Sequence, residues 1–244
     1  SFTTLISNGA FQNNPCHFLI LPSYTSESLQ SGTFNNSERY QRVTSYYKLA
    51  LQWPKSYCST QPRQLRQPCL EPQQFTIHGL WPVDSNDISI TCYGNNVPPL
   101  PPLGTVRTCP FYNDLVNSWP NLKNGQDNYS FWKHEWTKHG VCSRLKPNKY
   151  FEFAIMAYKS LPPLLEKLHP TIRPGHNYSL NLLHAESSKI YQKSVEINCN
   201  NRGAQHQFFE VFICFHLRGS ISKCPRSFAP TCTGVPNALV LFPN

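Results

Sequence analysis

The chain has 244 residues, a length that suits one domain or at most two. Hydrophobic residues make up 39% of the sequence and charged residues only 14%, which excludes wholesale disorder. A formal net charge of +9 favours an anionic partner, such as nucleic acid, an acidic glycan or a membrane surface, although charge also serves solubility.

The cysteines and sequons indicate an oxidising compartment. Ten cysteines occur without any Cys-x-x-Cys pair, which favours disulfides over a zinc ribbon or a redox motif. N-glycosylation sequons at Asn35, Asn128 and Asn177 agree, so we expect a secreted, extracellular glycoprotein. The longest early apolar run, 18–21, stops at Pro22 and is too short for a signal core or a membrane span, so we expect a signal peptide to have been removed upstream.

The sequence predicts both helices and strands, but they do not alternate along the chain as in βαβ units. Residues 1–45 are rich in Ser, Asn and Thr and nearly uncharged, so we predict an N-terminal extension. Apolar and other residues alternate over 47–53, which indicates a strand, and 74–82 is a short strand that delivers His78 to a turn. The later predicted elements are a loop (93–110), helices (111–119, 129–139, 148–161 and one from Pro162), a strand and hairpin (207–224) and a last strand (238–242). The predicted fold class is α+β.

The segment 131–142, FWKHEWTKHGVC, carries the densest group of side chains that could act in catalysis. If it is helical, one face presents Phe131, His134, Glu135, Lys138 and His139, while Trp132 and Trp136 anchor the flank. Side chains backed by buried indoles are held still, as catalysis requires.

Two other interpretations of this segment are weaker. Zinc proteases space their histidines four apart as His-Glu-x-x-His, whereas His134 and His139 are five apart with a lysine beside the second. The other interpretation is a solvated helix face whose histidines are incidental.

These residue types fit cleavage of RNA, which carries its own nucleophile. A neutral histidine can take the proton of the 2′-hydroxyl, a protonated histidine can donate one to the leaving 5′-oxygen, and a lysine can stabilise charge on the phosphate. No metal or other cofactor is needed. A further histidine, His78, precedes Trp81, an aromatic residue able to stack on a base.

Together, FTIHGLWP and FWKHEWTKHGVC resemble the two active-site segments of the ribonuclease T(2) family. YKLALQWPKSYC extends the resemblance, which covers roughly 46–244 as one catalytic domain. The resemblance implies an α+β fold with a central antiparallel sheet flanked by helices. It also implies metal-independent cleavage of single-stranded RNA, not DNA, through a 2′,3′-cyclic phosphate.

The resemblance also implies catalytic roles. His139 matches the general base and His78 the general acid. His134 matches the position that holds the scissile phosphate, and Glu135 and Lys138 match positions that manage charge in the transition state. Trp81 and Phe131 match base-contacting aromatics, and Gln52 matches a contact to the second base in plant members.

The plant branch of the family suggests a disulfide pattern. The implied pairs are Cys58–Cys69, Cys92–Cys142, Cys199–Cys232 and Cys214–Cys224. Cys16 and Cys109 are left over, and they either pair with each other or stay free, because connectivity is not readable from spacing.

The physiological role stays open between two groups of plant enzymes. Charge and sequons lean towards pistil self-incompatibility, and the alternative is defence or phosphate recovery. A different class of function is a secreted basic glycoprotein that binds RNA or a protein partner without catalysis. We expect a monomer.

Overall fold

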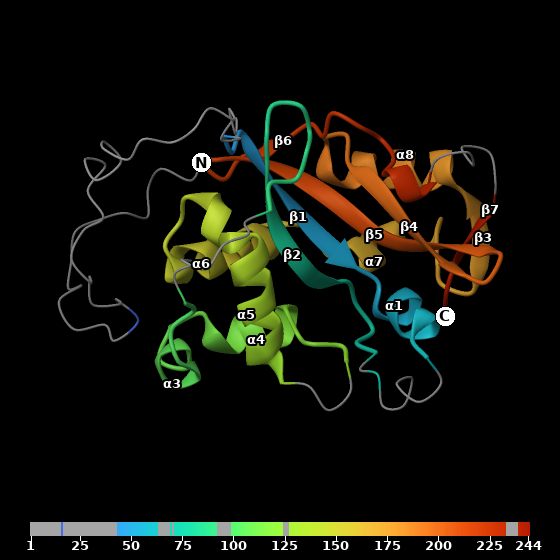
Figure 1. Cartoon of the computed structure of the whole chain (residues 1–244). Coiled ribbons are helices and arrows are strands. Elements are labelled where there is room, and N and C mark those ends of the chain that lie inside the picture. Colours follow the sequence, from blue (N-terminus) through green and yellow to red (C-terminus); the bar gives the residue numbers. More distant parts are fainter. Residues whose placement is uncertain are drawn as a thin grey trace, which may run out of the picture.

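A computed structural model describes residues 16, 43–62, 69, 71–91, 99–123, 127–232 and 239–244. Its centre is a seven-stranded sheet in the order β2-β1-β5-β7-β3, with β4 and β6 also paired to β5 (Figure 1). The strands are β1 (Tyr46–Gln52), β2 (Thr76–Val83), β3 (His176–Ser179), β4 (Glu196–Arg202), β5 (Gln205–His216), β6 (Ile221–Ser222) and β7 (Leu239–Phe242).

The sheet is antiparallel with one exception. β1 pairs antiparallel with both β2 and β5, and β4, β6 and β3 pair antiparallel with their neighbours. β5 and β7 run parallel where Gln207 faces Leu241. The predicted α+β class is confirmed, and β5–β7 is the parallel pair among the strands that the structure describes.

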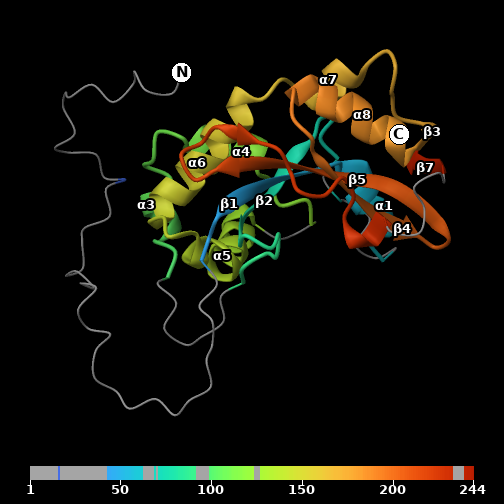
Figure 2. The same cartoon turned by 90° about the horizontal axis from the view of Figure 1, so that it is seen from above.

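The helices surround the sheet. Figure 2 shows α7 and α8 together on one side of the strands and α5 on the other. The helices are α1 (Pro54–Thr60), α3 (Leu103–Val106), α4 (Tyr112–Ser118), α5 (Asn128–Lys138), α6 (Pro147–Ser160), α7 (Leu164–Leu168) and α8 (Leu180–Tyr191), with short 3₁₀ helices η2 (Gly140–Ser143) and η3 (Pro230–Cys232). The predicted loop 93–110 is wrong where α3 forms one helical turn.

The predicted alternation in β1 is confirmed, and both of its faces are covered. Tyr47, Leu49 and Leu51 enter the main hydrophobic core and are at most 3% exposed. Lys48 and Gln52, on the other face, are also buried. β1 is therefore an interior strand whose polar side chains need partners close by.

The disulfides agree with the pattern implied by the family. Among the described residues, the sulfur atoms of Cys58–Cys69, Cys199–Cys232 and Cys214–Cys224 are bonded as predicted. Cys142 is disulfide-bonded, whereas Cys92, its predicted partner, lies outside the described residues.

The alternative left open for Cys16 and Cys109 is decided in favour of pairing. Cys16 is bonded to Cys109, just after α3, with the two Cα atoms 4.8 Å apart. Cys16 is buried, and its carbonyl accepts a hydrogen bond from Asn148 Nδ2 at 3.4 Å. The rest of 1–42, including the sequon at Asn35, lies outside the described residues, so the extension 1–45 stays a prediction.

Candidate active site

The strand β2 positions His78 through a bulge. Ala50 of β1 pairs with Gly79 and Leu51 pairs with Ile77, so His78 has no directly opposite residue. A bulge of this kind re-aims a side chain. The predicted turn after His78 is wrong, because β2 continues to Val83. β2 is an edge strand in which Pro82, lacking a backbone donor, is tolerated.

The helix α5 is capped and anchored. The Asp127 carboxylate accepts a hydrogen bond from Ser130 N at 2.7 Å and caps the helix. Trp132 and Trp136 are buried, as predicted, and Trp132 Nε1 donates to the Trp119 carbonyl at 2.8 Å. The helix that carries the candidate catalytic residues is therefore held firmly against the core.

The single helix face predicted for 131–139 is wrong at its end, and the side chains on it differ in exposure. His139 lies one residue beyond α5, in a non-helical conformation with φ −126°. Glu135 and His139 are 2% and 4% exposed, whereas His134 is exposed. The chain turns closely over an indole here, because a Cβ added at Gly140 would lie 2.3 Å from Trp136 Cε3.

A cavity of about 560 Å³ nevertheless brings together every residue to which a role was assigned. These residues are Gln52, His78, Trp81, Phe131, His134, Glu135, Lys138 and His139. The cavity is also lined by residues that were not predicted, namely Tyr57, Asn121, Leu122, Lys123 and Ser130. Tyr57 and Ser130 lie on α1 and α5, and the other three follow α4; none of the five side chains had been given a role from the sequence.

Trp81 lies between the two candidate proton-transfer histidines. Its ring centroid is 5.3 Å from that of His78 and 5.5 Å from that of His139. Its Nε1 donates to Glu135 Oε2 at 3.3 Å, and Phe212 packs on it at 5.3 Å. The indole thereby fixes the relative placement of the groups around it.

A buried carboxylate that was not predicted supports His78. Glu210 of β5 is 1% exposed, and its Oε1 lies 2.5 Å from His78 Nδ1. Its Oε2 accepts from Asn198 Nδ2 at 2.5 Å. A lone glutamate in the apolar strand 207–217 is the signal that could have found it, since a buried charge needs a partner.

The two histidines have opposite pKa shifts. Burial lowers the pKa of His78, but the carboxylates of Glu210 and Glu135 outweigh it and raise that pKa above its ordinary value. Burial, followed by the positive charge of Lys138, lowers the pKa of His139 to about 3. At neutral pH His139 is therefore a neutral imidazole, while the two carboxylates favour the protonated form of His78.

Glu135 is the third strongly perturbed group of the cavity. Burial raises the pKa of its carboxyl, while His78 and the hydrogen bond from Trp81 act in the opposite direction. The carboxylate also lies close to the backbone of β2, because a Cβ added at Gly79 would be 2.4 Å from its Oε2.

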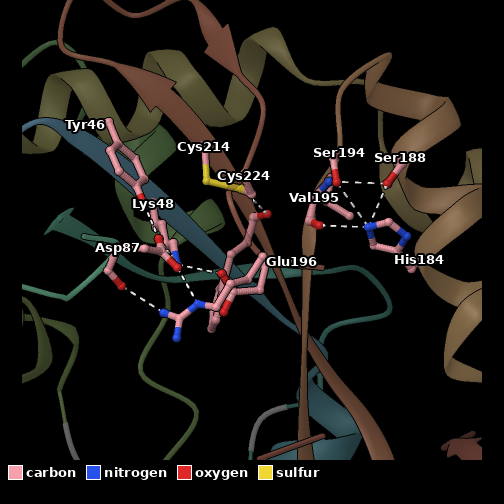
Figure 3. Close-up of a disulfide and its surroundings, with 12 residues drawn as sticks. Tyr46, Lys48, Asp87, His184, Ser188, Ser194, Val195, Glu196, Cys214 and Cys224 are labelled. Atoms are coloured by element: carbon pink, nitrogen blue, oxygen red, sulfur yellow. Dashed lines mark hydrogen bonds and ion pairs between the residues drawn. A yellow bond between two sulfur atoms is a disulfide. The ribbon is translucent and has the colours of Figure 1, made fainter. Parts of the chain in front are cut away.

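Figure 3 shows a buried ion cluster around Lys48, the residue of β1 that pairs with Trp81 of β2. Lys48 Nζ is 2.7 Å from Asp87 Oδ1 and 2.5 Å from Glu196 Oε2. Arg226 pairs with the Asp87 carboxylate through Nε and donates to its carbonyl at 2.8 Å. The Tyr46 hydroxyl also donates to Asp87. Two cations thus balance two buried carboxylates.

This cluster holds the loop 84–91 against the sheet. Asp87 has φ 62°, in the left-handed region that aspartate tolerates better than most residues. Three residues further on, the backbone of Ile90 hydrogen-bonds to His139 and partly offsets the lowering of its pKa. The contacts of Asp87 therefore hold in place the short loop whose Ile90 backbone bonds to His139, the candidate general base.

Within the described residues, no group of three or more His, Cys, Asp or Glu side chains is placed to hold a metal ion. The described helices also include none that is both long and apolar enough to cross a membrane.

Comparison with known proteins agrees with this geometry. A profile of the ribonuclease T2 family matches residues 44–224. Two tomato (Solanum lycopersicum) proteins are similar in sequence. Intracellular ribonuclease LX is 30% identical, covering 74% of this chain and 77% of the relative, and extracellular ribonuclease LE is 31% identical, covering 74% and 80%. The crystal structure of the self-incompatibility associated SF11-RNase of Nicotiana alata superposes with a TM-score of 0.69 at 29% identity, covering 82% of this chain and 100% of that one.

Fold, cavity and relatives together define a ribonuclease. The chain belongs to the ribonuclease T2 family, and the relatives just described are plant enzymes.

Proposed function

We propose that this chain is an endoribonuclease that cleaves single-stranded RNA by transphosphorylation without a metal. The observation that carries the proposal is the pair His78 and His139, which line one cavity and have pKa shifts of opposite sign. General acid–base catalysis needs one protonated and one neutral group at the same pH.

In the first step His139 accepts the proton of the 2′-hydroxyl, and the 2′-oxygen forms a bond to phosphorus. The bond from phosphorus to the 5′-oxygen breaks, and His78 donates its proton to that oxygen. The product end is a 2′,3′-cyclic phosphate. In the second step His78 accepts a proton from water, whose oxygen forms a bond to phosphorus. The bond from phosphorus to the 2′-oxygen breaks, and His139 donates its proton to that oxygen, which returns both histidines to their starting states.

In this proposal His134 and Lys138 line the cavity and contact the phosphate, His134 as a hydrogen-bond donor and Lys138 as a cation. A cation close to the phosphate oxygens stabilises the charge that develops on them in the transition state. Glu135, whose pKa is raised by burial, can share a proton with those oxygens. Phe131 is half-buried beside His78 and, with Trp81, is proposed to contact a base, while Gln52 contacts the second base.

The test is cleavage of a single-stranded RNA in the presence of EDTA, with detection of 2′,3′-cyclic phosphate ends. We expect His139→Ala to lose several orders of magnitude in rate. His216→Ala, an exposed histidine at the end of β5, is the matched control and should cleave normally. Absence of cleavage by the folded wild type would favour the alternative of a binding glycoprotein, and cleavage of DNA would contradict the need for a 2′-hydroxyl.

Secretion and glycosylation are part of the proposal. They are supported by the disulfides and by the sequon at Asn177, which is exposed on β3. Asn128 is half-buried, and its side-chain oxygen accepts from Asn121 N at 2.8 Å, so it is the less accessible sequon. Intact-mass analysis of the protein purified from its source tissue would show which asparagines carry glycans.

The physiological role proposed is pistil self-incompatibility, with defence or phosphate recovery as the alternative. Similarity to the self-incompatibility associated SF11-RNase and the basic charge support the first role. Abundance of the protein in styles, measured against leaves that are wounded or starved of phosphate, separates the two roles.

A further inference from the structure

A second cavity, of about 670 Å³, lies away from the catalytic one. Gln52 lines the catalytic cavity, whereas its neighbour Leu51 lines the second, and successive residues of a strand point to opposite faces of a sheet. The second cavity is enclosed by the end of α6, by α7 and the loop that follows it, and by the end of α8. Its volume is in the range of small-molecule sites.

The inner wall of this cavity is apolar. Leu51, Phe75, Leu164 and Ile172 line it and are at most 4% exposed. Prolines from the loops before and after α7 add rigid, apolar edges. Such a wall takes the hydrocarbon part of a ligand and gains free energy by removing it from water.

One buried hydroxyl lies in this wall without a partner. Tyr191 is 5% exposed, and its Oη has no hydrogen bond to any part of the chain that the structure describes. The neighbouring Tyr158 differs, since its hydroxyl donates to the Phe75 carbonyl at 2.8 Å. A buried polar group without a partner costs free energy, which a ligand with a hydrogen-bond acceptor would recover.

The outer edge of the cavity carries exposed cations. Lys159 and Arg173 both line it. Lys159 is already paired with Asp114 at 2.8 Å, whereas the Arg173 guanidinium makes no ion pair within the described ranges. An anionic group at this edge would therefore find an uncommitted positive charge.

We propose that the second cavity binds a small amphiphilic carboxylic acid, with its hydrocarbon body against Leu164 and Ile172. A hydroxyl or carbonyl oxygen at the buried end accepts a hydrogen bond from Tyr191, and the carboxylate lies at the edge near Arg173. This site is independent of RNA cleavage, because none of its lining residues lines the catalytic cavity.

The test compares two probes, decanoate and 10-hydroxydecanoate, by isothermal titration of the full chain. Both are expected to bind saturably with one molecule per chain, and the hydroxylated probe more tightly. Tyr191→Phe should weaken 10-hydroxydecanoate about fivefold to tenfold while leaving decanoate unchanged, because only the first uses the hydroxyl. Arg173→Gln should weaken both probes, and this effect should fade at high salt.

Controls separate binding from folding. Arg218→Gln removes an exposed arginine elsewhere on the chain and should bind both probes as the wild type does. Free Tyr191→Phe should melt at the wild-type temperature or above, since it loses only an unpartnered hydroxyl. The proposal is overturned if neither probe binds saturably, or if Tyr191→Phe changes the affinity for both probes by the same factor. It is also overturned if the ligand-free variant melts well below the wild type.

Discussion

Glu210 and His78 meet across the strand that separates them. β1 lies between β5 and β2, yet Glu210 Oε1 is 2.5 Å from His78 Nδ1. The bulge at His78 faces the Ala50–Leu51 step of β1, and Glu210 pairs with Gln52 on the other side of that strand. Nδ1 is thereby committed to the carboxylate, which leaves Nε2 as the ring nitrogen available for the proposed proton transfer.

Replacing Glu210 with Gln should shift the pH profile. The carboxylate raises the pKa of His78, so its loss lowers that pKa and moves the alkaline limb of kcat/KM to lower pH. At pH 7 we expect kcat/KM to fall roughly tenfold to a hundredfold. A full pH–rate profile checks this.

The control for Glu210→Gln is Glu152→Gln, which removes a partly exposed carboxylate paired with Lys149 on α6. It should leave the profile unchanged. If Glu210→Gln lowers the rate equally at every pH, Glu210 acts only through the fold and the positioning role is wrong.

Lys138→Gln should affect the acid limb. The positive charge of Lys138 helps to hold the pKa of His139 at about 3, so its removal raises that pKa and moves the acid limb to higher pH. Loss of a cation near the phosphate should also lower kcat, by roughly tenfold to a thousandfold. Lys133→Gln, on the exposed face of the same helix, is the matched control, and an equal effect of both would show that only net charge matters.

The site could be largely predicted from sequence because two local segments carry most of it. His78 and Trp81 lie within β2, and Phe131 to Lys138 lie within α5 with His139 one residue beyond its end, so local spacing fixes most of the neighbours. Their burial could not be predicted. Whether Glu135 faces solvent or the core depends on β2 and Trp81, which approach from 54 residues away along the chain.

Glu210 and the ion cluster were missed for the same reason. Their contacts join β1, β2, β4, β5 and the loops. The partners are far apart along the chain, so no local sequence pattern predicts that they meet. The helix α8 and the strand β4 were also not predicted. In α8 the signal was present, because Leu180, Leu183 and Tyr191 recur at helical spacing on its buried face. The strand β4 carries mostly polar residues, so its place in the sheet depends on tertiary packing.

Asp87→Asn should destabilise the fold in a pH-dependent way. Burial acts to raise the pKa of Asp87, but hydrogen bonds from Lys48 and Tyr46 outweigh it and lower that pKa. A lowered folded-state pKa contributes stability above the ordinary carboxyl value of about 3.9, and that stability is lost as the pH falls below it.

We therefore expect Asp87→Asn to cost about 3 kcal/mol at pH 7, since it leaves buried Lys48 with one carboxylate instead of two, and less at pH 3. Urea unfolding at both pH values measures this. Asp114→Asn, which removes an exposed partner of Lys159, should cost at most about 1 kcal/mol at either pH. A pH-independent loss in Asp87→Asn would mean that the backbone of the loop, not the charge, is responsible.

Gly79→Ala tests whether close approach of β2 to α5 sets the catalytic geometry. The added Cβ would lie 2.4 Å from both Glu135 Oε2 and Trp81 Nε1, too close for either to stay in place. Because Trp81 contacts both His78 and His139, its displacement should disturb the whole set. We expect kcat/KM to fall roughly a hundredfold and stability to fall by about 1–3 kcal/mol.

The matched control is Gly104→Ala, where an added Cβ meets nothing within 4 Å and the residue lies in the short helix α3. Alanine is the better helix former, so this variant should cleave RNA normally and be slightly more stable, by up to about 1 kcal/mol. Thermal melts and single-turnover cleavage on both variants separate the effects. If Gly79→Ala loses stability but keeps full single-turnover rates, then Trp81 and Glu135 have adjusted without cost to the chemistry, and the tight contact serves only the packing of α5 on β2.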